Sequence, residues 1–117
     1  HFLNGIETHC LKQITSANFD DSVILVCFYH NFENFVEKWM KHYLMIGVKN
    51  FVFVDHCSTD HSTKILKQYE NEVHISFWRM DEKYNCYEMC GWKQQIMEFY
   101  GTDRHYLIVD SDELLIY

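Results

Sequence analysis

Short, continuous apolar runs constrain the fold of this chain more than any other feature. Three such runs, over 23–29, 51–54 and 106–109, consist almost entirely of aliphatic and aromatic residues. A run of this kind, without polar alternation, is typical of a strand that is buried on both faces. Such strands belong to parallel sheets, because crossover connections place helices over both faces. The runs therefore predict an α/β domain.

The segment between the first two runs predicts an amphipathic helix. Apolar residues from Phe32 to Leu44 recur at intervals of three and four residues, which places them on one helix face. Asn31 is a suitable N-cap, and Gly47 is placed to end the helix in a left-handed conformation. This helix supplies the crossover that two parallel strands need.

The rest of the chain continues the alternation of strand and helix. A second helix is predicted after the second run, a strand over 73–78, and a third helix over 86–100. Four residues offer N-caps for the second helix: Ser58, Thr59, Asp60 and Ser62. The order predicts a three-layer α/β/α architecture with a mostly parallel sheet. We expect this domain over 22–117, preceded by an N-terminal extension over 1–21.

Composition narrows the class of protein. With 117 residues, of which 48% are hydrophobic, the chain suffices for one small domain with a core. The formal net charge of −7 argues against a nucleic-acid surface, which needs basic side chains. A single nucleotide remains compatible, because a metal ion can supply positive charge. No apolar run approaches the roughly 20 residues of a membrane helix. Five irregularly spaced cysteines predict reduced thiols in a cytosolic protein.

Chemistry-bearing residues follow three of the predicted strands. In such a sheet, ligands bind outside the carboxyl ends of the strands. The residues placed there are Tyr29 and His30 after the first strand, Asp55 and His56 after the second, and Asp110, Ser111 and Asp112 after the last. The carboxylates of Asp110 and Asp112 are hard oxygen ligands of the kind that Mg²⁺ and Mn²⁺ prefer. The alternative is an acidic loop that only hydrates the strand end.

The other residues at this edge also have two interpretations each. Asp55 could accept a hydrogen bond from a ribose hydroxyl or a base, or it could cap the next helix. Tyr29 could stack on a base, or it could be a core aromatic. His30 could donate to a phosphate or a base, or it could be an ordinary loop histidine. Arg79 and Lys83 could neutralise a diphosphate, or they could be surface charges.

Several nucleotide-binding and hydrolytic motifs are absent from the sequence. It contains no G-x-G-x-x-G, no G-x-x-x-x-G-K-[ST] and no G-x-S-x-G. A dinucleotide-binding domain, a P-loop NTPase and an α/β-hydrolase are therefore disfavoured.

Three blocks of the sequence together resemble the family 2 glycosyltransferases, in the subgroup with a D-x-D-E motif. The first block is His30-Asn31 with the helix that contains Trp39. The second is Asp55-His56-Cys57-Ser58-Thr59-Asp60, which resembles the D-x-x-S-x-D signature of the family. The third is Asp110-Ser111-Asp112-Glu113. The blocks occur in the order of the family and span residues 22–115.

The resemblance implies a truncated GT-A fold and a metal-dependent sugar transferase of polysaccharide biosynthesis. By resemblance, the nucleotide sugar would contact Tyr29, His30, Asp55, His56, Asp110 and Ser111. Asp110 and Asp112 would flank the diphosphate and hold Mn²⁺ or Mg²⁺. The donor would be a nucleotide-diphosphate sugar, a UDP-sugar foremost, and the acceptor a carbohydrate or a glycolipid. In the family the catalytic base lies downstream of the D-x-D motif, so we expect none in this chain. Such a protein is expected in the cytoplasm or peripherally at the inner face of a membrane.

Two other interpretations stay open at this point. The chain could be a non-catalytic or partner-dependent nucleotide-binding module with a degenerate GT-A fold. It could instead be a sugar nucleotidyltransferase, a class with a similar sheet and metal site. That class usually has a Gly-rich, basic loop after the first strand to hold a triphosphate. The stretch Tyr29-His30-Asn31-Phe32-Glu33 contains no Gly, Lys or Arg.

Overall fold

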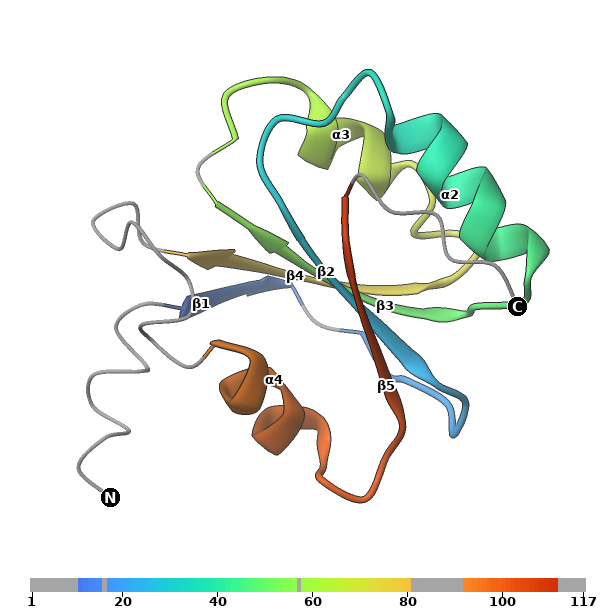
Figure 1. Cartoon of the computed structure of the whole chain (residues 1–117), viewed down its shortest axis with the longest axis vertical. Coiled ribbons are helices and arrows are strands. Elements are labelled where there is room, and N and C mark those ends of the chain that lie inside the picture. The colour runs from blue at the N-terminus through green and yellow to red at the C-terminus, as the bar shows by residue number, and fades with distance from the viewer. Residues whose placement is uncertain (1–10, 16, 57, 81–91, 112–117) are drawn as a thin grey trace.

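The computed structural model describes residues 11–15, 17–56, 58–80 and 92–111 (Figure 1). Within these ranges the chain forms five strands and three helices. Their bounds are β1 Leu11–Thr15, β2 Ile24–Tyr29, α2 Val36–Met45, β3 Asn50–Asp55, α3 Ser62–Lys67, β4 His74–Met80, α4 Trp92–Tyr100 and β5 Tyr106–Asp110.

The strands form one sheet in the order β1-β4-β3-β2-β5. Strands β2 to β5 are parallel to one another, and β1 pairs antiparallel with β4 at one edge. The predicted mostly parallel α/β sheet is therefore confirmed. The chain adds strands outward from β2 through β3 to β4, and then crosses back to place β5 on the other side of β2.

Helices cover both faces of the sheet. Figure 1 shows α2 and α3 over one face and α4 over the other, which gives the predicted three layers. Along β2, Leu25 and Cys27 belong to the core under α2 and α3, whereas Ile24 and Val26 belong to the core beside α4. All four are essentially inaccessible to solvent. Burial on both faces explains why the strand is continuously apolar in sequence.

Residues 11–15, which fall in the predicted N-terminal extension, form β1 in the sheet. Its register pairs Leu11 with Met80 and Gln13 with Trp78. The burial of β1 alternates between covered and exposed positions, as is typical of an edge strand with one face in contact with the core. This short alternation explains why no strand was predicted there.

Two predicted helix ends have different outcomes. Gly47 follows α2 with a φ of +96°, as predicted for a left-handed C-terminal residue. The prediction that Asn31 caps this helix is wrong, because α2 begins at Val36 and its N-cap is Phe35, which makes no side-chain capping bond. The N-cap of α3 is His61, also without a side-chain capping bond. The polar residues around these helix starts therefore have other partners, which are described below.

The third predicted helix is described in part. Helix α4 is described from Trp92 to Tyr100, and the predicted residues 86–91 lie outside the described ranges. Ile96 is fully buried in the core between α4 and the sheet. Among the described residues, no helix combines the length and the apolar character that crossing a membrane would require.

Candidate functional site at the carboxyl edge of the sheet

Strand β2 is the point at which the strand order reverses, because β3 and β5 lie on opposite sides of it. In open α/β sheets, ligands bind outside the carboxyl ends of the strands next to such a point. The parallel register pairs Tyr29 with Asp55 and Phe28 with Asp110. The structure thus brings the ends of these three strands together at one edge.

Asp55 ends β3 and is 7% exposed. Its Oδ1 accepts a hydrogen bond from the backbone N–H of Ser58 at 2.9 Å, which closes the turn after the strand. An ionised carboxylate accepts hydrogen bonds at both oxygens, so this contact does not use all the acceptor capacity of Asp55. Arg79 of β4 lies opposite Asp55 in the register and is exposed. Lys83, the other predicted cation, lies outside the described residues.

Tyr29 lies in the core and is 1% exposed. Its ring packs against Phe32 and Phe53, and its hydroxyl shares a 2.5 Å hydrogen bond with Oγ1 of Thr63. Burial raises the pKa of the Tyr29 phenol above its ordinary value, against the opposing effect of the Thr63 bond. A ring enclosed in this way offers no face to a base, so the burial supports the core interpretation of Tyr29 over the stacking one.

His30 and His56 follow β2 and β3 and lie beside each other, with ring centroids 6.0 Å apart. Nδ1 of His30 is 2.6 Å from the backbone carbonyl of His56, which can only accept. Nδ1 of His30 must therefore carry the proton, and the neutral ring presents Nε2 as an acceptor. His30 could donate from Nε2 to a phosphate only when the ring is protonated. The backbone N–H of His56 donates to the carbonyl of Tyr29, which joins the residue after β3 to the end of β2.

Asp110 ends β5 and is exposed. Its backbone carbonyl accepts a hydrogen bond from Nε1 of Trp39 at 3.2 Å. Trp39 is fully buried in α2, where its ring contacts Tyr43 and Phe53. The indole therefore ties the carboxyl end of β5 to the helix that follows β2. Trp39 was part of the family resemblance, but its contact with the acidic strand end could not be read from the sequence.

A depression of about 350 Å³ lies beside the end of β5. It is lined by Asn31, Phe32, Asn34, Phe35 and Ser111. Four of these five residues come from the loop after β2, and the fifth directly follows Asp110. Of the predicted binding residues, Ser111 is thus the one that lines this depression.

The predicted metal site is only partly within the described residues. Asp110 is described, whereas Asp112 lies outside the described ranges. Across the ranges that the structure describes, no group of three or more His, Cys, Asp or Glu side chains is arranged to hold a metal ion. The pairing of Asp110 with Asp112 around Mn²⁺ or Mg²⁺ therefore stays a prediction.

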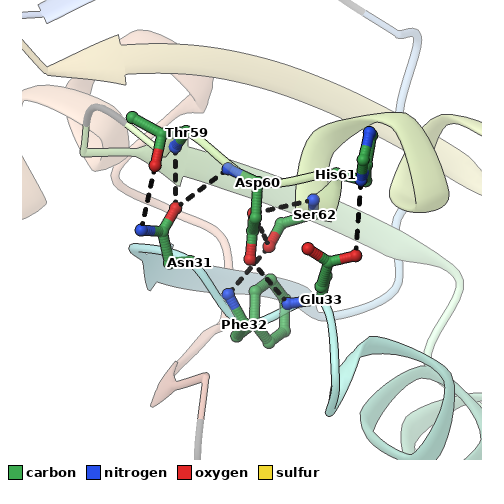
Figure 2. Close-up of polar contacts among 7 residues, drawn as sticks. All are labelled: Asn31, Phe32, Glu33, Thr59, Asp60, His61 and Ser62. Atoms are coloured by element: carbon green, nitrogen blue, oxygen red, sulfur yellow. Dashed lines mark hydrogen bonds and ion pairs between the residues drawn. The ribbon is translucent and has the colours of Figure 1, made fainter.

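Asn31 has a role at this edge that the sequence did not reveal. Its backbone is in the left-handed region, with a φ of +48°, which asparagine tolerates better than most residues. Its Oδ1 accepts hydrogen bonds from the backbone N–H groups of Thr59 and Asp60, at 2.7 and 3.2 Å (Figure 2). Its own backbone N–H donates to Oγ of Ser58 at 3.0 Å. Asn31 therefore joins the loop after β2 to the loop after β3.

Neither a scan against models of known protein families nor a search of curated proteins finds a match for this chain.

Proposed function

We propose that this chain is the donor-binding part of a GT-A type glycosyltransferase and binds a nucleotide-diphosphate sugar together with Mn²⁺ or Mg²⁺. One observation carries the proposal. Asp55 and Asp110 end the two strands that flank β2, at the point where the strand order reverses. The family resemblance assigns the nucleoside to Asp55, and the diphosphate with its metal to Asp110. Their placement at one sheet edge supports that assignment.

The residues at this edge suit the parts of such a donor. Asp55 accepts a hydrogen bond from a ribose hydroxyl or a base N–H, in addition to its bond from Ser58. Ser111 and the loop after β2 line the depression, which receives the part of the ligand next to the acidic strand end. Tyr29 supports the site from the core and does not touch the ligand.

The donor set fits a hard divalent cation. Asp110 provides an exposed carboxylate at a strand end, and Asp112 follows two residues later. Mg²⁺ and Mn²⁺ bind through one or two carboxylates plus the phosphates of the substrate. When bound, the ion would stabilise the charge on the leaving nucleoside diphosphate. In a chain of net charge −7, it would also offset repulsion of an anionic ligand.

Titration calorimetry of the chain with UDP, GDP and CDP, with and without MnCl₂, tests the proposal. We expect one of the three nucleotides to bind, and to bind only with the metal. Asp110→Asn and Asp112→Asn should abolish the binding that depends on the metal, and Asp55→Asn should weaken binding of the same nucleotide. Asp103→Asn is the matched control, because Asp103 is exposed and lies just before the amino end of β5.

Two results would contradict the proposal. One is that the folded chain binds none of the nucleotides with Mn²⁺ present. The other is that Asp103→Asn weakens binding as much as Asp110→Asn, since the effect would then follow from overall charge.

A further inference from the structure

The loop after β2, residues 30–35, is held by side chains that belong to the next loop and helix (Figure 2). Oδ2 of Asp60 accepts a hydrogen bond from the backbone N–H of Glu33 at 3.1 Å. Oγ of Ser62 accepts one from the backbone N–H of Phe32 at 2.8 Å. Together with the bonds of Asn31, these contacts fix three consecutive residues of the loop.

Asp60 and Ser62 act as one unit. The backbone N–H and the hydroxyl of Ser62 both donate to Oδ1 of Asp60, at 2.9 and 2.6 Å. Ser62 is fully buried, so its hydroxyl is held in this geometry without competition from water. Burial alone would raise the pKa of Asp60, but the hydrogen bonds from Ser62 and Glu33 lower it overall, which keeps the carboxylate ionised and accepting.

The loop that this unit holds forms most of the depression beside β5. Asn31, Phe32, Asn34 and Phe35 line the depression, and only Ser111 comes from elsewhere. The helix that follows does not fix the loop through a cap, since Phe35 makes no side-chain capping bond. The shape of the depression therefore depends on contacts across to Asp60 and Ser62.

We propose that Asp60 and Ser62 are positioning residues for the nucleotide site, because they hold the loop after β2 in the shape that the ligand requires. The inference rests on the proposed function, since it assigns the loop to that site. It also gives a physical reason for the spacing D-x-x-S-x-D. Asp55 accepts a hydrogen bond from the ligand, while Ser58 and Asp60 accept hydrogen bonds from the backbone of the loop after β2.

A second buried serine in the chain provides a matched control. Ser76 of β4 is also fully buried, and its Oγ accepts the backbone N–H of Ala17 at 2.9 Å. Both serines thus satisfy one backbone N–H from a distant segment. Ser62 does so at the carboxyl edge of the sheet, whereas Ser76 joins β4 to the segment that precedes β2.

The test compares Ser62→Ala, Ser76→Ala and Asp60→Asn with the unmodified chain. Urea unfolding gives the stability of each, and calorimetry with MnCl₂ gives the Kd for UDP, GDP or CDP, whichever binds. We expect both serine variants to lose stability, Ser62→Ala the more because its hydroxyl makes two hydrogen bonds where that of Ser76 makes one. Only Ser62→Ala should raise the Kd, by about tenfold or more. Asp60→Asn should raise it too, because an amide in place of Oδ2 cannot accept from Glu33 while Oδ1 keeps its bonds to Ser62.

The outcomes separate the two proposals. If the unmodified chain binds but Ser62→Ala and Asp60→Asn bind with the same Kd, the positioning role is overturned and the proposed function stands. If Ser76→Ala raises the Kd as much as Ser62→Ala, stability alone explains the effect and the positioning role is again overturned. If the unmodified chain binds no nucleotide, both proposals fall. Should Ser62→Ala fail to fold, the Kd of the isosteric Asp60→Asn tests the positioning role instead.

Discussion

The two edges of the sheet use the same kinds of polar residue for different purposes. At the amino edge, Nδ2 of the fully buried Asn50 donates to Oδ1 of Asp20 at 2.7 Å and to Oγ of Ser22 at 3.1 Å. Arg104 donates to the backbone carbonyls of the same two residues. These bonds tie together the segments that lead into β2, β3 and β5. The polar groups of the amino edge therefore hold these strand-leading segments to one another.

At the carboxyl edge, an equally dense network lies beside an exposed acid and a depression. Asn31, Asp60 and Ser62 join two loops, while Asp110 stays exposed on β5.

A polar network alone therefore does not mark a binding site. Exposed acids and a depression also occur at the amino edge, where Asp20 is exposed and Arg104 and Tyr106 line a depression of about 320 Å³. What distinguishes the carboxyl edge is that its network holds a loop at the point where the strand order reverses, rather than joining the segments that lead into the strands.

The largest expected effect is that of Trp39→Phe. This variant tests whether the position of the carboxyl end of β5 depends on its hydrogen bond to α2. The change removes the hydrogen bond to the Asp110 carbonyl and leaves a cavity, so we expect a loss of about 2–3 kcal/mol in the free energy of unfolding. Nucleotide affinity should fall as well. Urea unfolding and calorimetry measure the two effects.

Trp78→Phe is the matched control for that variant. Trp78 packs beside α4, on the other face of the sheet, and its Nε1 donates to the hydroxyl of Tyr100 at 3.0 Å. Its replacement should lower stability without changing nucleotide affinity. Equal losses of affinity in both variants would show that the carboxyl edge has no special dependence on Trp39.

Asn50→Ala should have the next largest effect. It tests whether the polar groups of the amino edge serve to join the segments that lead into the strands. The variant loses the bonds to Asp20 and Ser22 and leaves a cavity at a fully buried position, so we expect a loss of about 2 kcal/mol in the free energy of unfolding. Nucleotide affinity should be unchanged at temperatures where the variant is folded. A large fall in nucleotide affinity would contradict the proposal that the amino edge stabilises the fold while the carboxyl edge binds the ligand.

Asn31→Gly should have a smaller effect, of about 1 kcal/mol in the free energy of unfolding. Glycine adopts the left-handed backbone of Asn31 without strain, so the loss isolates the side-chain bonds to Thr59 and Asp60. Asn31→Ala should cost about 1 kcal/mol more, because it adds the left-handed strain. Urea unfolding of both variants measures the difference, and an Asn31→Gly protein as stable as the original would refute the role of the side chain.

The smallest effect is expected from lowering the pH, which protonates Asp20 at the amino edge. Hydrogen bonds from the hydroxyl and the backbone N–H of Ser22, and from Asn50, lower the pKa of Asp20 from 3.8 to about 2. A lowered folded-state pKa contributes stability that is fully present above pH 3.8 and is lost as the pH falls through about 2. Asp20 is exposed, so the contribution is small. Urea midpoints across this window should fall less steeply for Asp20→Asn, and parallel slopes would contradict this.

The sequence predicted the parts of the fold that depend on local pattern. Strands β2 and β3 were predicted because strands buried on both faces are continuously apolar. Strand β5 has the same kind of apolar run, but the expectation that it is buried on both faces is wrong, because β5 lies at the edge of the sheet and Ile108 is 36% exposed. Strand β1 was missed, since an edge strand of five residues has too short an alternation to stand out. The turn at Gly47 was predicted because its left-handed backbone strongly favours glycine.

The site was predictable only as far as strand ends can be placed. That Asp55 and Asp110 lie at the same edge of the sheet followed from topology, but the contacts of individual side chains did not. Whether Tyr29 is enclosed depends on Phe32 and Phe53, which lie in different elements. The bonds between Asn31 and the loop after β3 span 27 residues or more, so an N-cap was the only local interpretation available.

Paramagnetic broadening by Mn²⁺ tests the difference between the two edges most directly. Amide spectra of the labelled chain are recorded with UDP, GDP or CDP and substoichiometric MnCl₂, with MgCl₂ as the diamagnetic reference. The account predicts that the signals of Asn31, Asp110 and Ser111 disappear while those of Asp20, Asn50 and Arg104 persist. Broadening centred on the amino edge, or spread evenly over the chain, would contradict it.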